Sequence, residues 1–145
     1  MCGWCDWNCV RQLAEAENLM DREEPHILIS SPLAGEEKCA RCAALSRRGQ
    51  IASVVDDASQ VTRLSDMAGA PSLDLAIDVD VGQARTGVVG PNKAMGLAKQ
   101  IAALPNLRCA GIQGYASHVQ HIVTIEERLQ AARRPPSGCA KSCPL

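Results

Sequence analysis

The sequence predicts an α/β fold in which about four to five parallel strands alternate with helices. Short apolar runs recur along the chain, and segments with helical spacing of apolar residues separate them. This alternation is typical of repeated βα units around a parallel sheet. Polar residues also gather just after two of the runs, where α/β proteins place their sites. A complete eight-stranded barrel needs about 250 residues, so the 145 residues predict an open sheet or roughly half of a barrel.

The first three elements are a helix, a strand and a second helix. Residues 10–20 (VRQLAEAENLM) combine helical spacing with strong helix formers, and Pro25 prevents that helix from continuing. Residues 26–30 (HILIS) are a short apolar run, which predicts a buried strand. Residues 36–48 predict an amphipathic, alanine-rich helix with Gly49 as its C-cap.

A strand and a helix follow in the middle of the chain. Residues 50–55 (QIASVV) predict the strand, and Asp57 or Ser59 could cap a helix that runs to Met67. A further strand, which would be the first of five, is expected within residues 3–7.

The last third predicts two strands and two helices. Residues 73–79 (LDLAIDV) and 107–113 (LRCAGIQ) predict strands. Residues 92–104 predict the helix between them, with Pro91 near its start. Residues 118–133 predict one final helix.

Composition limits the class of protein. Hydrophobic residues make up 46% of the chain, which predicts one globular domain over residues 1–134. The residue types at positions 135–145 predict an unstructured tail. The net charge of -1 gives no electrostatic case for a nucleic acid or an anionic membrane as partner. No apolar run approaches the roughly 18 residues of a membrane span, and the N-terminus lacks the pattern of a secretory signal. The expected location is the cytoplasm.

The polar clusters after the two late strands predict where chemistry would occur. They comprise Asp78, Asp80, Gln83 and Arg85 after the first strand, and Gln113, Tyr115 and His118 after the second. Because the carboxyl ends of parallel strands share one edge of a sheet, these side chains are expected to lie on one face.

Several motifs in this order resemble the D-threonine aldolase / D-serine dehydratase-like family. The family's D-x-G-x-x-R-x-G-V strand end has counterparts in Asp80, Gly82, Arg85, Gly87 and Val88. Its L-R-x-x-G-[IL]-Q-x-Y strand end and the loop that follows have counterparts in Leu107, Arg108, Gly111, Ile112, Gln113, Tyr115, His118, Gln120 and His121. The segments LAEAENLMD, PHILIS and IASVVDDASQVTRL are also similar to family segments.

The resemblance implies a partial TIM barrel of the alanine racemase-like type with a pyridoxal phosphate site on its carboxyl face. It implies that Arg85 lies beside the cofactor ring, and that Gln113, Tyr115 and His118 line the same pocket. The implied reaction is retro-aldol cleavage of a D-β-hydroxy-α-amino acid to glycine and an aldehyde. A lysine-bound pyridoxal phosphate is the electron sink, and a divalent metal holds the substrate hydroxyl.

The chain departs from the family pattern in three places. Ala116 and Ser117 stand where the family has a histidine or aspartate followed by glycine. The R-P-H-x-K-T-H-K motif with the Schiff-base lysine is absent, and so are the family's metal ligands near its C-terminus. The lysines present are Lys38, Lys93, Lys99 and Lys141, and none ends a predicted strand. The resemblance therefore predicts an internal fragment that is inactive by itself, and a noncatalytic pyridoxal phosphate-binding or homo-oligomeric module is the alternative.

The candidate residues also have simpler interpretations. Arg85 could pair with Asp78 or Asp80 at the surface, and Tyr115 could be a buried core residue with a satisfied hydroxyl. His118 and His121 could share a helical face and bind a metal, but solvated histidines at a helix start are the more common case.

The eight cysteines suggest a third function. Cys2 and Cys5, together with Cys39 and Cys42, have the form of a four-thiolate zinc site. Cys39 and Cys42 also lie one turn apart in a predicted helix, where packing of small apolar groups explains them well, and free thiols are the default expectation. Cys-based zinc binding remains an alternative at this point.

Overall fold

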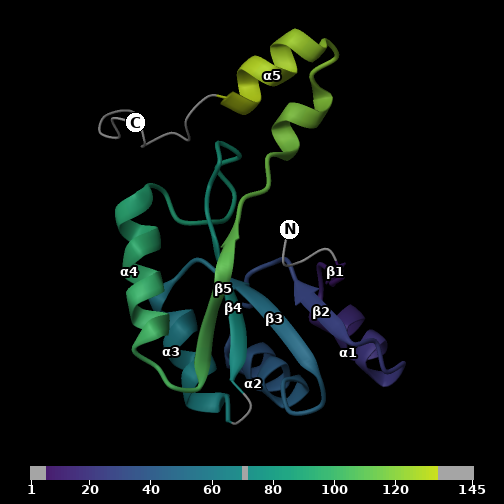
Figure 1. The fold of residues 1–145 in the computed structure, drawn as a ribbon, viewed down its shortest axis with the longest axis vertical. Helices are drawn as coiled ribbons and strands as arrows, with labels where there is room; N and C mark the ends of the chain where they lie inside the picture. The colour runs from purple at the N-terminus through teal and green to yellow at the C-terminus, as the bar shows by residue number, and fades with distance from the viewer. Residues whose placement is uncertain (1–5, 70–71, 134–145) are drawn as a thin grey trace.

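The computed structural model describes residues 6–69 and 72–133, which form one parallel sheet and the helices around it (Figure 1). The strands are β1 (Asn8–Val10), β2 (His26–Ile29), β3 (Gln50–Val55), β4 (Leu73–Asp78) and β5 (Leu107–Gln113). The helices are α1 (Leu13–Asp21), α2 (Glu36–Leu45), α3 (Ala58–Met67), α4 (Pro91–Ala102), the 3₁₀ helix η1 (Ser117–His121) and α5 (Ile125–Arg133). The expected tail, residues 135–145, and most of the expected strand at residues 3–7 lie outside the described residues.

The sheet has the strand order β1-β2-β3-β4-β5, and every neighbouring pair is parallel. Spatial order therefore follows chain order. Since parallel crossovers are right-handed, such an order places the connecting helices on one face of the sheet. The α/β prediction is confirmed, with five strands in an open sheet.

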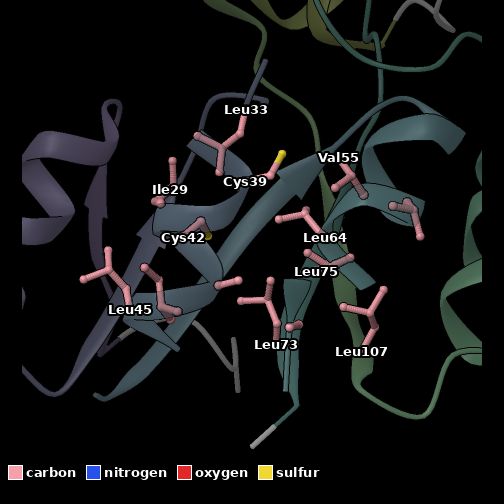
Figure 2. Close-up of a cluster of buried hydrophobic side chains, with 14 of the residues drawn as sticks. Ile29, Leu33, Cys39, Cys42, Leu45, Val55, Leu64, Leu73, Leu75 and Leu107 are labelled. Atoms are coloured by element: carbon pink, nitrogen blue, oxygen red, sulfur yellow. The ribbon is translucent and has the colours of Figure 1, made fainter. Parts of the chain in front are cut away.

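The core lies between the sheet and its helices. Alternate strand residues point to opposite faces, and Ile27, Ile29, Val55, Leu75 and Ile77 all join the buried cluster beneath the helices. Figure 2 shows part of this cluster, which contains Cys39 and Cys42 of α2 together with strand residues such as Ile29 and Leu75. With no phenylalanine in the chain, the core consists of aliphatic and small side chains.

The opposite face of β4 carries polar residues. Asp74 and Asp78 occupy the positions that alternate with Leu75 and Ile77, so their side chains leave the helix-covered face. Asp74 is paired with Arg108 of β5, which lies directly opposite it in the sheet. Asp78 has Gln113 as its direct neighbour. The sheet therefore brings the two polar strand ends together, as the sequence predicted.

Some predicted boundaries were wrong. The first strand is Asn8–Val10, so α1 begins at Leu13, where the Glu15 carboxylate accepts hydrogen bonds from the backbone N–H groups of Arg11 and Gln12. Helix α2 ends at Leu45 rather than at residue 48.

The single final helix predicted over residues 118–133 is in fact two helices, η1 and α5. The Thr124 hydroxyl caps α5 by accepting a hydrogen bond from the Glu127 backbone N–H and donating one to its carboxylate. This N-cap starts a new helix and breaks the expected one. Figure 1 shows α5 beyond the carboxyl ends of the strands, where it contacts mainly η1.

None of the helices in the described ranges has the length and apolar character that crossing a membrane requires.

Candidate functional site

A cavity of about 490 Å³ opens at the carboxyl ends of the strands. Its lining comes from the ends of β1, β2, β4 and β5 and the loops after them. The lining residues are Cys9, Arg11, Ser30, Ser31, Asp78, Val79, Asp80, Val81, Gln83, Arg85, Thr86, Gln113, Gly114, Tyr115 and Ser117. The cavity therefore lies where a parallel α/β sheet places its functional residues.

Gln113 forms the floor of the cavity. Its side-chain Nε2 donates to the Ser30 carbonyl at 3.1 Å and lies 3.5 Å from Asp78 Oδ1. Strands in a sheet lie about 4.8 Å apart, so β2 and β5 would be about 14 Å apart if the sheet were flat. One glutamine side chain cannot span that gap, so the contact shows that the sheet curls as a barrel wall does.

Asp78 is a buried carboxylate at the end of β4. Burial raises its pKa above the usual range, and the nearby Asp56 carboxylate acts in the same direction. Hydrogen bonds to Thr86 and Gln113 and the Arg85 guanidinium oppose the increase. Asp78 and Arg85 thus attract each other, and both line the cavity.

The loop after β4 is held by carboxylates at both ends. Asp80 Oδ1 accepts hydrogen bonds from the backbone N–H groups of Gly82, Gln83 and Ala84 at 2.9–3.0 Å, which lowers the pKa of Asp80. At the far end, Asp56 Oδ2 accepts a hydrogen bond from the Gly87 N–H at 3.0 Å.

Val88 also pairs with this strand end. Its N–H donates to the Asp78 carbonyl, and its carbonyl accepts from the Asp80 N–H. Gly87 is required for this pairing, because a Cβ there would lie 2.5 Å from the Asp80 nitrogen.

Arg85 is exposed on this loop and lines the cavity. Within residues 6–69 and 72–133 it is attracted by the Asp78 carboxylate but forms no ion pair or hydrogen bond through its guanidinium. The interpretation of Arg85 as half of a surface ion pair is therefore wrong, and Arg85 lines the cavity without a guanidinium partner among the described residues.

Tyr115 follows β5 at the other side of the cavity and is 48% exposed. The interpretation as a buried core tyrosine is therefore wrong. The predicted residues Arg85, Gln113 and Tyr115 thus meet at one cavity.

His118 is not part of the cavity lining. Its imidazole lies over Gly82, where a Cβ would be 3.6 Å from Cε1 and Nε2 of His118. His118 and His121 are both exposed on η1.

Sequence reasoning missed the lining residues from β1 and β2, which are Cys9, Arg11, Ser30 and Ser31. A search for polar residues after every apolar run, rather than after the last two, would have found the serines after β2. Strand β1 has three residues and gives no such signal.

The cysteine pattern is explained by packing as far as the structure describes it. Cys39 and Cys42 are fully buried in α2, and burial raises the pKa of Cys42 to about 12. Cys2 and Cys5 lie outside the described residues. Within the described ranges no three His, Cys, Asp or Glu side chains form a group that could hold a metal.

Comparison with known proteins gives consistent matches. The family described as "Alanine racemase, N-terminal domain" matches residues 2–135. The chain is 36% identical to a D-threonine aldolase from Arthrobacter sp over 129 residues, which are 87% of this chain and 34% of that protein. It is 32% identical to a 3-hydroxy-D-aspartate aldolase from Paracoccus denitrificans over 123 residues, which are 83% and 32% of the two chains.

Solved structures match the fold. The crystal structure of D-threonine aldolase from Filomicrobium marinum superposes with a TM-score of 0.81 at 30% identity, covering 85% of this chain and 34% of that one. Alanine racemase from E. faecalis matches with a TM-score of 0.68 at 19% identity over 88% of this chain and 37% of that one.

The chain spans about a third of the length of the relatives it matches. Within that span, the parallel sheet has its strands in chain order and curls as a barrel wall does. Both features agree with the family match. The chain belongs to the alanine racemase N-terminal domain family, with a partial barrel of that type.

Proposed function

We propose that this chain forms one wall of the pyridoxal phosphate site of a lyase that cleaves D-β-hydroxy-α-amino acids to glycine and an aldehyde. The observation that carries the proposal is the cavity where Arg85, Gln113 and Tyr115 meet, in a chain similar to a D-threonine aldolase over 87% of its length. We also propose a small D-amino acid as substrate and a cytoplasmic location.

The residues present fit the proposed cofactor. A cavity of about 490 Å³ is within the roughly 300–1,000 Å³ of ligand pockets. A planar guanidinium suits a phenolic oxygen or a ring nitrogen, because its donors are fixed in a fork and its charge is permanent. A phenol ring can cover an aromatic face. Arg85 and Tyr115 offer these groups, and no partner of the Arg85 guanidinium is found in the part of the chain that the structure describes.

Bound pyridoxal phosphate supplies an electron sink for the carbanion that the cleavage generates. Arg85 would hold the ring and bias its charge, and the Asp78 carboxylate would attract the guanidinium toward the same cavity. Gln113 braces the floor by joining β5 to β2, and Tyr115 bounds the opposite side.

We expect this chain to bind the cofactor without catalysing the cleavage. No lysine lies among the cavity's lining residues. Lys38 belongs to α2, Lys93 and Lys99 belong to α4, and Lys141 lies outside the described residues. The amine that would bind the cofactor covalently is therefore expected to come from outside this wall.

An absorbance titration of the 145-residue chain with pyridoxal phosphate tests the proposal. We expect saturable binding. Arg85→Ala should weaken it roughly 10- to 100-fold, since a hydrogen bond to a charged group contributes about 1.5–3 kcal/mol. Arg22→Ala, which removes an exposed arginine at the end of α1, is the matched control and should change nothing. Absence of binding, or equal loss in both variants, would refute the proposal.

Activity is tested separately with D-threonine, pyridoxal phosphate and Mn²⁺. We expect no glycine to form. Glycine production by this chain would contradict the expectation that the lysine lies elsewhere.

An oligomerisation module is the second candidate, and the open sheet favours it. Strands β1 and β5 are edges, and unpaired edges invite pairing with another chain. Beside β5 an apolar groove of about 530 Å³ lies against α4, with Met95 57% and Ile112 69% exposed. Light scattering that shows a monomer at all concentrations would remove this candidate.

A further inference from the structure

Two loops bear the two sides of the cavity, and one side-chain hydrogen bond joins them. Gln83 lies on the loop after β4, two residues before Arg85. Ser117 begins η1, two residues after Tyr115. Gln83 Nε2 donates to Ser117 Oγ at 2.6 Å, and both half-buried residues line the cavity. We call this bond the Gln83–Ser117 clasp.

Backbone hydrogen bonds hold the segments that carry both partners of the clasp. The Gln83 backbone N–H donates to Asp80 Oδ1 at 2.9 Å, which ties Gln83 to the end of β4. On the other side, the Ala116 carbonyl accepts from the Val119 N–H and so closes the first turn of η1 after Ser117. The clasp therefore connects two anchored segments rather than two free side chains.

The loops also approach each other closely on either side of the clasp. A Cβ at Gly114 would lie 2.7 Å from Cγ1 of Val81, so only glycine leaves room there. His118 covers Gly82 at ordinary contact distance. This packing brings the loops together, whereas the clasp supplies a directional bond that fixes their register.

We propose that Gln83 and Ser117 are positioning residues that set the separation of Arg85 and Tyr115 across the cavity. Each clasp residue is two positions from the group it places, so breaking the bond releases both groups together. The identity of the ligand rests on the proposed function, but the coupling of the two loops does not.

A double-mutant cycle on pyridoxal phosphate affinity tests the proposal. Gln83→Ala and Ser117→Ala should each weaken binding about 3- to 10-fold, the range expected for one neutral hydrogen bond. The double variant should lose no more than either single variant, because both changes remove the same interaction. Ser117→Thr keeps the hydroxyl and should bind within about 2-fold of the parent.

The matched control is Gln100→Ala, which removes a glutamine that bonds to Ala58 and Thr62 away from the cavity and should leave affinity unchanged. The proposal would be overturned if the losses of affinity of the two single variants were additive, or if Ser117→Thr bound as weakly as Ser117→Ala.

Amide hydrogen exchange without cofactor separates this inference from the proposed function. Either single alanine variant should accelerate exchange in both loops, residues 81–87 and Ser117–His121. If the parent chain does not bind pyridoxal phosphate, the proposed function fails and exchange alone decides the clasp. If exchange stays unchanged or speeds up only in the mutated loop, the clasp is wrong, and cofactor binding by the parent would still support the proposed function.

Discussion

Asp78 shows how a single residue can serve a site at a cost to the fold. A carboxylate in this buried position must lose its hydration, and the raised pKa records that loss. Its hydrogen bonds and the Arg85 guanidinium offset only part of the effect. A core position with a free choice of residue would carry an apolar side chain, so we expect this carboxylate to serve the cavity that it lines.

Asp78→Asn should therefore stabilise the fold at neutral pH while weakening cofactor binding. Because the folded-state pKa is raised, the folded chain holds the proton more tightly than the unfolded chain, and wild-type stability falls as pH rises through that range. The melting temperature of the variant minus that of the wild type should thus be larger at pH 7 than at pH 3.5. Thermal unfolding at the two pH values measures this, and a pH-independent difference would contradict it.

Gly87 is the residue on which the loop after β4 depends most. Its φ is +98°, and a Cβ would collide with the Asp80 nitrogen. We expect Gly87→Ala to destabilise the chain by more than about 3 kcal/mol, combining backbone strain with the clash.

Gly90→Ala is the comparison for that substitution. Its φ is +85°, but open space surrounds the added methyl group, so about 1–3 kcal/mol of strain alone is expected. Equal losses of the two variants in urea unfolding would show that the contact with Asp80 is unimportant.

Residue-level prediction worked where a side chain follows a recognisable strand. Arg85, Gln113 and Tyr115 could be assigned to one face because β4 and β5 are clear in the sequence. His118 was expected in the pocket but is not among its lining residues, and its imidazole lies over Gly82, because the turn of η1 decides its direction and leaves no periodic signal. Arg11 was missed because β1 is too short to recognise.

Among the elements, α2 shows why a motif needs its surroundings. Cys39 and Cys42 have the spacing of metal ligands, but the helix turns both into the core (Figure 2). A metal site and a packed helix would both place the two cysteines one helical turn apart. Only the direction of the helix's apolar face distinguishes the two interpretations.

Alkylation of the native chain should spare these two thiols. At pH 8 Cys42, whose pKa burial raises to about 12, is ionised in roughly one molecule in ten thousand, and the thiolate is the reactive form. Burial also raises the pKa of Cys39, whose side chain is fully buried. Cys9 and Cys109 are exposed and should react readily. Mass-spectrometric mapping after a short exposure to iodoacetamide checks this, with denatured chain as the control; modification of Cys42 at the rate of Cys109 would contradict it.

Helix boundaries were predictable where a cap was visible. Asp57 caps α3 as expected, with its side chain accepting from the Ser59 N–H at 2.8 Å. The break before α5 has a cue in Thr124, a favourable N-cap residue, but the continuous helical pattern concealed it.

For the molecule as a whole, the alternation of strands and helices was enough to predict the fold class. The curling of the sheet could not be predicted from it. Curling depends on contacts such as that of Gln113 with Ser30, which join residues 83 positions apart. No local pattern encodes a pairing at that separation.

The open sheet predicts a gradient of stability across the molecule. Residues of β4 and most of β3 are buried, while much of β5 is exposed at an edge. Amide exchange should therefore be slowest in β3 and β4 and much faster in β1 and α5. Protection of α5 equal to that of β4 would contradict this order.

The strand order has a consequence for synthesis on the ribosome. Each new strand joins the outer edge of the strands already made, because strands β1 to β5 lie side by side in the order in which they are translated. No later strand has to be inserted between two earlier ones, so the described sheet can grow as the chain emerges, and domains generally fold from the N-terminus during synthesis. The lining residues at the ends of β1 and β2 would then be in place first, and Gln113, Tyr115 and Ser117 would be the last parts of the cavity to arrive.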